Sequence, residues 1–264
     1  MKIADMKVTE LINEVGSGTP APGGGAVAGL AGGVGVALTM MVNGLTLDKK
    51  GFENDRERLL DAIAKGNELK ERFIDVMNRD SEVFDGLIES LALPKDDDAH
   101  KAIRRGAVQA SFRSCTQVPL TMMEICSEAI DLCAELVGTT NPNVVSDLGI
   151  AALTLKTAMQ SAWLNVLINL SSLKDKAFRD ECCQKGEALL AHAVPIAQES
   201  YEKVLKVITE KLALCLLVFR HFTPSAASST RRGRRAFFFP EFLQFTVAFC
   251  GFCGTIPSVH ILSI

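Results

Sequence analysis

The chain is predicted to fold as an all-α protein, an up-and-down bundle of about five to six long helices with two buried apolar helices. Apolar residues recur at helical spacing through most of residues 1–211. Almost no stretch alternates with the period of two that marks a half-exposed strand. Hydrophobic residues make up 48% of the 264-residue chain and charged residues 22%, which suits a globular domain with a sizeable core.

Six helical segments are expected in order along the chain. They are an amphipathic helix over 5–15, an apolar helix over 26–47, a charged helix over 52–91, a fourth segment up to 137, a second apolar helix over 145–173, and a closing helix over 175–211. The charged helix would be about 60 Å long if unbroken, so it must bend near Gly66 or belong to an elongated, paired bundle. Pro119 predicts a kink or a break in the fourth segment.

The two apolar helices admit two interpretations. Each is apolar nearly all round, which is typical of a helix buried by its neighbours but also of a membrane span. Gly29 and Gly33 form a GxxxG pair, a spacing common where transmembrane helices meet. The second helix contains Asp147 and Lys156, however, and the charged helices are suited to covering the apolar ones in water. We therefore expect a soluble bundle without membrane association, in which small residues allow close packing or a dimer interface.

The composition of the chain changes near Lys211. Five arginines, one glutamate and nine of the 14 phenylalanines lie beyond Leu212. The sequence therefore predicts a helical domain over 1–211 and an atypical basic, phenylalanine-rich extension over 212–264 that is not part of it. Prolines and a glutamate leave the extension only about 15 uninterrupted residues, fewer than the roughly 20 of a membrane helix. We interpret it as a lineage-specific addition or an artefact of translation rather than as an anchor.

Several classes of function are excluded by composition. The net charge of -3 gives no support to nucleic-acid binding. Of the eight cysteines only Cys250 and Cys253 have CxxC spacing, without a second pair or nearby histidines, so no metal site is predicted. The first 15 residues are amphipathic and lack the apolar core of a signal peptide. We expect a cytoplasmic protein with reduced thiols.

Polar side chains form one stripe along the second apolar helix. Its members are spaced by three or four residues, the period of one helix face: Thr154, Thr157, Ser161, Asn165, Asn169 and Ser172, with Asp147 in line at the start. Threonine and serine are explained by hydrogen bonds between helices, but a buried asparagine needs several partners, which a polar ligand could supply. The first apolar helix carries a matching face with Thr39, Asn43 and Thr46, which packing explains as well.

An acid interrupts the apolar stripe of the charged helix. Phe73, Met77 and Phe84 mark the stripe, and its register requires an apolar side chain at position 80 or 81, where the sequence has Asp80 and Ser81. An inward-facing carboxylate is costly unless it has a partner or a function. If Ser81 is the inward residue, Asp80 is only a solvated flank of the helix, and the residues alone leave both readings open.

The segment "GTPAPGGG" precedes the first apolar helix and ends in Gly23, Gly24 and Gly25. It lacks the lysine and hydroxyl residue of a phosphate-binding loop and follows no strand. A rigid proline segment, a glycine hinge and a helix N-terminus with free amides remain. Lys49 and Lys50 follow the same helix, where they either bind a carboxylate or complement the helix dipole.

The quoted segments together resemble a known family. "SGTPAPGGGAVAGLAGGVGVALTMMVNGLTLDKKGFE", "RDSEVFDGL", "TQVPL", "NPNVVSDLGIAA" and "LNVLINLSSLKD" occur in the order found in the cyclodeaminase/cyclohydrolase family, which comprises methenyltetrahydrofolate cyclohydrolases and the cyclodeaminase half of formimidoyltransferase-cyclodeaminase. The resemblance covers 1–211 and implies an all-helical homodimer that binds a reduced folate. Leu167 stands where the family leads us to expect a basic residue, and the extension has no counterpart.

The resemblance also implies roles for the candidate residues. Asp80 is expected to be the general acid/base, and Asp147 to orient the pterin or act as a second acid. The expected substrate-binding residues are Asn165 and Asn169 for hydrogen bonds, Gly23, Gly24 and Gly25 for the flat ring, and Lys49, Lys50 and Arg113 for the anionic glutamyl tail. Asn43 is a further expected substrate-binding residue. No metal and no permanently bound cofactor is implied, since the tetrahydrofolate derivative is the substrate.

Three functions remain to be compared. Only about 25 residues precede the end of the glycine block, so no formimidoyltransferase domain is expected there. This favours hydrolysis of 5,10-methenyltetrahydrofolate to 10-formyltetrahydrofolate over formimidoyltetrahydrofolate cyclodeaminase activity with release of ammonia. The alternative of another class is an inactive helical module that binds folate or only a protein partner, which Leu167 and the unusual extension would fit.

Overall fold

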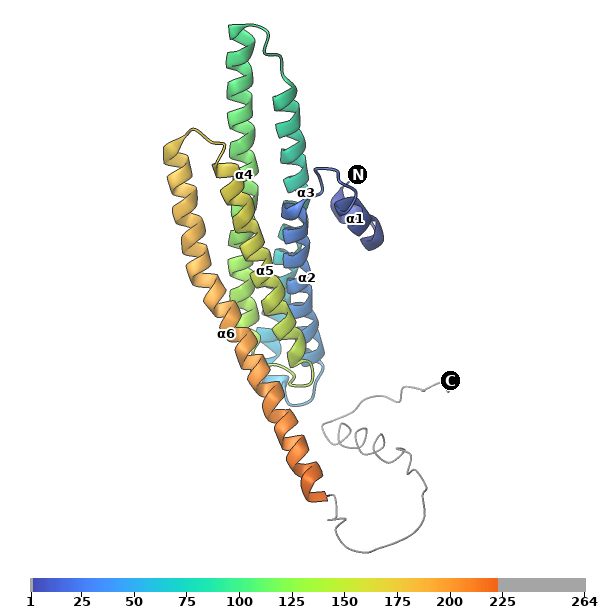
Figure 1. Cartoon of the computed structure of the whole chain (residues 1–264). Helices are drawn as coiled ribbons and strands as arrows, with labels where there is room; N and C mark the ends of the chain where they lie inside the picture. The colour runs from blue at the N-terminus through green and yellow to red at the C-terminus, as the bar shows by residue number, and fades with distance from the viewer. Residues whose placement is uncertain (1, 223–264) are drawn as a thin grey trace, which may run out of the picture. The chain divides into compact units, whose positions relative to one another are not determined.

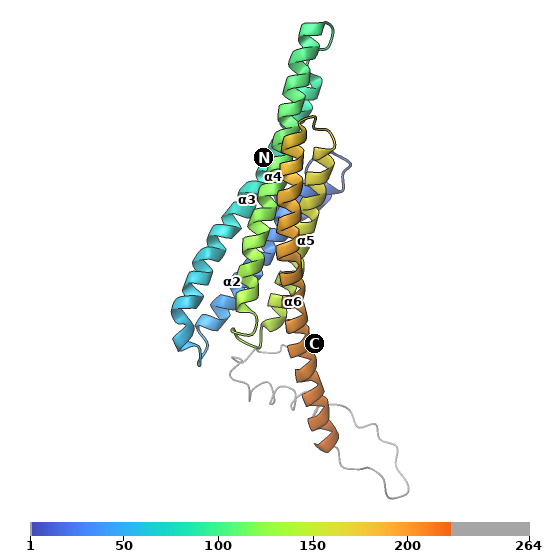
Figure 2. The same ribbon diagram turned by 90° about the vertical axis from the view of Figure 1, so that its left-hand side faces the viewer.

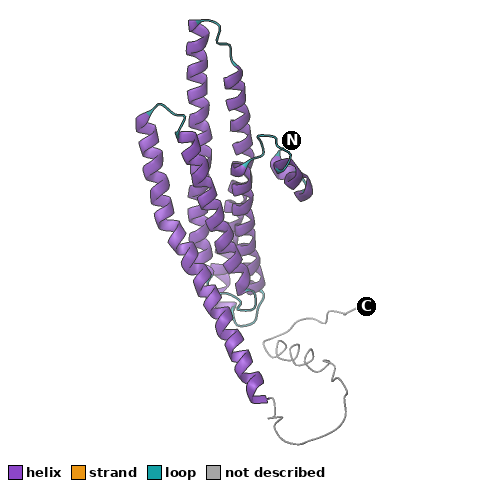
Figure 3. Ribbon diagram, viewed as in Figure 1, coloured by secondary structure: helices purple, strands orange, loops and turns teal. Residues whose placement is uncertain are grey.

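The computed structural model describes residues 2–222, and all of the regular secondary structure in that range is helical (Figures 1 and 3). Its elements are the short 3₁₀ turn η1 (Ile3–Asp5), α1 (Val8–Val15), α2 (Gly24–Leu47), the 3₁₀ turn η2 (Glu53–Asp55), α3 (Arg56–Ala92), α4 (Asp98–Leu136), α5 (Val145–Leu170) and α6 (Lys176–Phe222). The all-α prediction is confirmed, with six helices packed side by side. The helix bounds agree with the sequence prediction within a few residues except at the end of α6.

The bundle lies within the compact unit Met1–Leu216. Helices α2 to α6 alternate in direction along the chain (Figures 1 and 2). Helix α2 packs against α3 and α5, and α4 packs against the same two helices, so that α2–α5 form a closed ring of four. Cross-helix contacts attach α6 to α4 and α5, among them the one between Lys156 and Gln198. Helix α6 continues past the predicted boundary at Lys211, and residues 223–264 lie outside the described range, so the separate character of the extension stays a prediction.

Glycines on α2 let this helix approach its neighbours closely. A Cβ atom added at Gly32 would lie 2.2 Å from the ring of Phe73 on α3, and one at Gly35 would lie 2.7 Å from Leu155 on α5. Phe73 and Leu155 are fully buried. Of the predicted GxxxG pair, Gly29 takes part in this packing, since its Cβ would lie 2.9 Å from Met77, whereas a Cβ at Gly33 would lie at an ordinary 3.6 Å from Phe73.

The expectation that both apolar helices are buried on all sides is wrong for a single chain. On α2 the residues Val27, Leu30, Val34, Met41 and Leu45 are between 39% and 49% exposed, and on α5 the exposed apolar residues are Ile150, Leu153, Leu164, Leu167 and Ile168. By length and composition α2 could span a membrane, and half of its most apolar window is buried in the bundle. Each helix thus keeps one uncovered apolar stripe.

Neither Pro119 nor Gly66 breaks its helix, because α4 and α3 each continue as one helix through these positions. Proline has no N–H for the carbonyl four residues earlier, which here belongs to Cys115. The side-chain Nδ2 of Asn169 on α5 donates to that carbonyl at 2.7 Å. A neighbouring helix thus replaces the missing hydrogen bond, and the elongated form of the bundle accommodates the full length of α3.

The contact between Gly32 and Phe73 predicts a cost for adding one methyl group. Gly32→Ala should lower the free energy of unfolding by about 1 to 3 kcal/mol, the range for overpacked cores, in urea titrations at one fixed protein concentration. The control is Gly33→Ala, whose Cβ would lie 3.6 Å from the same Phe73. It should be neutral or stabilising by up to about 1 kcal/mol, because alanine has the higher helix propensity. Equal effects of the two variants would contradict the packing argument.

Candidate functional site

A cavity of about 330 Å³ lies where four helices meet. It is bordered by the segment that opens α2, by the last third of α3, by α4 and by the end of α5. Its polar side chains are Asp80, Ser81, Asn165, Asn169, Ser171 and Ser172, and its apolar ones include Phe84, Leu87, Phe112, Cys115 and Ile168. A volume at the lower end of ligand pockets suits a ring system of bicyclic size.

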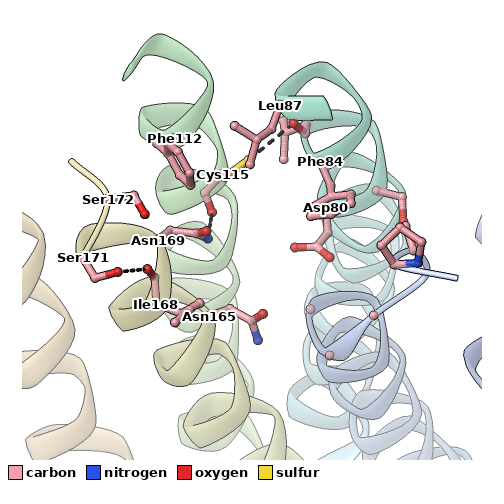
Figure 4. Close-up of a pocket in the computed structure, with 17 residues that line it drawn as sticks. Asp80, Phe84, Leu87, Phe112, Cys115, Asn165, Ile168, Asn169, Ser171 and Ser172 are labelled. Atoms are coloured by element: carbon pink, nitrogen blue, oxygen red, sulfur yellow. Dashed lines mark hydrogen bonds between the residues drawn. The ribbon is translucent and has the colours of Figure 1, made fainter. Parts of the chain in front are cut away.

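Asp80 provides the charged group in this cavity. Its carboxylate lies on one side, facing the asparagines of α5 across the space (Figure 4). Burial raises the pKa of Asp80 from its ordinary value of 3.8 to about 6, and the backbone amide of Ala26 in the first turn of α2 acts in the opposite direction. Near pH 7 the group is therefore mostly ionised yet exchanges its proton readily, as a general acid/base requires.

Asn165 and Asn169 lie one turn apart on α5 and line the opposite side of the cavity (Figure 4). The Nδ2 of Asn165 donates to the Ser161 carbonyl at 2.9 Å, and the Nδ2 of Asn169 donates to the Cys115 carbonyl. Both amides are thereby oriented, and within residues 2–222 neither Oδ1 receives a hydrogen bond. The polar stripe thus offers two fixed carbonyl oxygens to a ligand that carries N–H groups.

Ser81 is the neighbour that sequence reasoning weighed against Asp80. Both residues line the cavity, so Asp80 and Ser81 both face inward rather than only one of them. The Ser81 hydroxyl is buried and has no hydrogen-bond partner in the described part of the chain. A buried hydroxyl without a partner is costly, and a ligand in this cavity could supply one.

Aromatic and apolar lining residues were missed by sequence reasoning to different degrees. Phe84 and Leu87 continue the stripe of Asp80 by steps of four and three residues, so the helical period alone could have placed them beside the acid. Phe112 and Cys115 come from α4, whose own sequence carries no sign that this turn faces a cavity. Burial raises the pKa of the Cys115 thiol to about 11, which keeps it protonated.

The glycine block borders the cavity as predicted, since Gly23, Gly24 and Gly25 all line it. Leu167 does not line it, and its side chain is 40% exposed on α5. The position at which we expected a basic residue is therefore outside the cavity of a single chain.

Four predicted site residues lie toward the opposite end of the bundle. Asn43 is about 27 Å along α2 from Gly25, and Asp147 is about 27 Å along α5 from Asn165. Lys49 donates to Asn141 at 2.6 Å, beyond the far end of α2, and Lys50 follows it. Within a single chain, therefore, Asp147, Asn43 and the two lysines do not border the cavity that contains Asp80. Their roles toward the substrate stay predictions.

The remaining predicted cation, Arg113, is engaged elsewhere. It follows Phe112 in the sequence but forms an ion pair with Asp175 and lies over the ring of Phe178 at 4.0 Å. No lysine, arginine or histidine of residues 2–222 lines the cavity. Asn43 is fully buried away from the cavity, and within residues 2–222 neither atom of its side-chain amide has a hydrogen-bond partner. Its role toward the substrate stays a prediction.

One cluster with metal-ligating atoms occurs in the described residues, at the turn before and into α4. Atoms of Asp96, Asp97 and His100 lie within 4.8 Å of one another. Asp97 caps α4 by accepting from the His100 amide at 2.7 Å, and the His100 ring approaches both carboxylates. Helix capping and an exposed charge pair explain this cluster locally, and it does not border the cavity.

Comparisons with known proteins agree on one family. The profile described as formiminotransferase-cyclodeaminase matches residues 7–188. The chain is 34% identical over 197 residues to methenyltetrahydrofolate cyclohydrolase of Methylorubrum extorquens, covering 75% of this chain and 95% of that protein. It is 29% identical over 191 residues to formimidoyltransferase-cyclodeaminase of Mus musculus, covering 72% of this chain and 35% of that protein. The chain thus spans about a third of the mouse relative.

A solved structure has the same fold. The crystal structure of formiminotetrahydrofolate cyclodeaminase from Thermotoga maritima superposes with a TM-score of 0.69 at 24% identity, covering 80% of this chain and all of that one. At this identity the likeness concerns the fold alone. With the profile match over most of the helical bundle and the long alignment to the bacterial cyclohydrolase, these findings show that the chain belongs to the formiminotransferase-cyclodeaminase family.

Proposed function

We propose that this protein hydrolyses 5,10-methenyltetrahydrofolate to 10-formyltetrahydrofolate. The observation that carries the proposal is Asp80, a carboxylate with a pKa of about 6 in a cavity of ring size, facing two oriented asparagine amides. The relatives act on one-carbon derivatives of tetrahydrofolate by name. The bacterial cyclohydrolase is matched over 95% of its length, the mouse bifunctional protein over 35%, which favours the hydrolytic reaction.

The chemistry uses the lone carboxylate twice. In the substrate one carbon bridges two nitrogens as a delocalised cation, which a nearby anion stabilises. Asp80 takes a proton from water as the water oxygen bonds to that carbon. The protonated Asp80 then gives this proton to the departing nitrogen as the C–N bond breaks. The second water proton leaves to solvent and a formyl group remains, so atoms and charge balance.

The asparagines would hold the ring in place during these steps. Their free Oδ1 atoms on α5 can accept hydrogen bonds from the pterin N–H groups, and the side chains of Phe84 and Phe112 provide apolar surface for the ring. Because the cavity lacks a basic side chain in residues 2–222, the glutamyl tail would extend beyond it. Holding water and ring in fixed positions converts the attack into an intramolecular step.

A cyclodeaminase reaction is the second candidate, and the fold match to the Thermotoga maritima protein supports it. In that reaction the N10 nitrogen of the folate attacks the carbon of the formimino group on N5. The former imino nitrogen is then protonated and departs as ammonia. The same carboxylate could receive the proton of the attacking nitrogen and deliver one to the leaving amine. The site therefore suits either reaction, and an assay must separate them.

The proposed hydrolysis predicts a loss of methenyltetrahydrofolate absorbance at neutral pH that depends on enzyme concentration. Spontaneous hydrolysis without protein is the baseline, and 5-formiminotetrahydrofolate is tested in parallel. Appearance of methenyl absorbance from the formimino compound would make the protein a cyclodeaminase. Folded protein that changes neither substrate would contradict both enzymatic proposals and leave an inactive module, whose folate binding a titration would then measure.

Removing the acid function of Asp80 should abolish turnover. Asp80→Asn keeps the shape of the side chain, and general acid–base catalysis contributes about 10²- to 10⁴-fold, so kcat should fall by at least about 10²-fold with an unchanged helical circular dichroism spectrum. The matched control is Asp75→Asn on the same helix, where the carboxylate is exposed and activity should persist. Turnover of Asp80→Asn at the wild-type rate would remove Asp80 from the mechanism.

We also propose that the protein is a homodimer in which a second copy covers the exposed apolar stripes of α2 and α5. The α2 stripe is uncharged along its whole length, so the same surface on two copies can pack without an unpaired charge. The helices are neighbours in the ring. The α5 side also carries exposed Thr157 and Gln160, which suits a protein partner better than lipid.

The dimer predicts that one charge on the α2 stripe dissociates the protein. Sedimentation equilibrium should give a dimer for the wild type and a monomer for Val34→Lys. Ile103→Lys, at a residue that is 64% exposed on α4, should remain dimeric. A wild-type monomer at micromolar concentration would contradict the proposal, as would binding of the wild type, but not of Val34→Lys, to phospholipid vesicles.

A further inference from the structure

The contact surface between α2 and α3 follows a regular pairing that ends at Asp80. Cβ atoms added to α2 would meet Phe73 at Gly32, Met77 at Gly29, and Asp80 at Gly25. The α3 partners are spaced by four and three residues, and the glycines by three and four, as expected for two antiparallel helices. Asp80 therefore occupies the last position of an otherwise apolar contact row.

Gly25 is the glycine of this row whose α3 neighbour is a polar side chain, the Asp80 carboxylate. A Cβ there would lie 2.2 Å from Oδ1, 2.3 Å from Oδ2 and 2.4 Å from Cγ of Asp80. These separations are far below van der Waals contact, so any side chain at position 25 would take the space of the whole carboxylate. The adjacent Gly24 differs, because its Cβ would lie 3.8 Å from the Asn165 amide, an ordinary contact.

We propose that Gly25 is a positioning residue for Asp80: the missing side chain seats the carboxylate against the first turn of α2 and holds it at the cavity. The free amides of a helix N-terminus favour a negative charge, and the amide of Ala26 acts on this carboxylate. Gly25 was expected to make room for the flat ring of the substrate. In this proposal it makes room for the Asp80 carboxylate instead. The seat is independent of the reaction, whereas its effect on turnover rests on the proposed function.

The seat reconciles two demands on a catalytic carboxylate. Among apolar neighbours alone, burial would push its pKa up until it is protonated at neutral pH. If the side chain were exposed to water, its pKa would return to the ordinary range of aspartate, so the carboxylate would be a weaker base. Its position would also no longer be fixed by neighbouring groups. Contact with the α2 terminus fixes the group while favouring the ionised form, which leaves the pKa at about 6.

The first test is a double-mutant cycle that needs no activity. Gly25→Ala and Gly24→Ala are each measured by urea unfolding in the wild type and in an Asp80→Ala background, at one pH and one protein concentration. Gly25→Ala should lower the unfolding midpoint in the wild type but match Gly24→Ala once the carboxylate is removed. An equal loss in both backgrounds would overturn the proposal. If Gly25→Ala does not fold, recovery of folding in the double variant supports it, and failure there overturns it.

The second test measures the Asp80 carboxyl directly by carbon NMR titration, with Asp80→Asn to assign the signal. A displaced carboxylate changes both its burial and its contact with the α2 amide, so the pKa should differ by about one unit from the wild-type value in Gly25→Ala and stay near that value in Gly24→Ala. An unchanged pKa in Gly25→Ala would overturn the seat even if the enzyme is active.

The kinetic consequence is a separate readout. With Asp80 as the base, the acid limb of the kcat/KM profile should move in pH in the same direction as the titration, and kcat at its plateau should fall by about 10²-fold for a displaced group. If the NMR titration of Asp80 shifts in Gly25→Ala but the pH dependence of kcat/KM does not, Gly25 positions Asp80 and Asp80 is not the catalytic base. Failure of the proposed function is thereby distinguished from failure of the seat.

Discussion

The close approach of α2 to α3 is the constraint on which the rest of the structure depends. Packed helices are ordinarily separated by about 8 to 10 Å, and glycines on the facing side of α2 remove the side chains that would hold it away. Phe73 and Met77 fill the resulting contact row, and Asp80 continues it into the cavity. The same row thus buries apolar surface at one end and supports an acid at the other.

Helix positions and faces could be read from the sequence because both depend on local periodicity. The interruption of an apolar stripe at Asp80 and the repeated asparagines of α5 pointed to the cavity correctly, since a stripe identifies which side chains share a face. A stripe does not say which end of that face carries the site. Asn43, Lys49 and Asp147 were therefore grouped with residues about 27 Å away along their helices.

The direction of successive helices explains why these residues lie away from the cavity. In an up-and-down bundle the start of α2 lies beside the end of α5, so Gly24 approaches Asn165, while the segment after α2 meets the segment before α5, so Lys49 reaches Asn141. Contacts such as Phe112 with the cavity depend on rotation of α4 about its own axis, which its mixed apolar and polar sequence does not specify. Packing of the assembled helices decides these positions.

The hydrogen bond from Asn169 to the Cys115 carbonyl, which Pro119 leaves without its usual donor, bears on how α4 forms as one helix. The sequence of α4 alone contains a helix breaker at Pro119, and the hydrogen bonding of the continuous helix is completed by a side chain that arrives only when α5 docks. The continuity of α4 is therefore a tertiary property: separated from the bundle, this segment would consist of two shorter helices with a solvated joint. The joint lies at the turn that carries Cys115, so formation of the cavity wall and closure of the helix are one cooperative event.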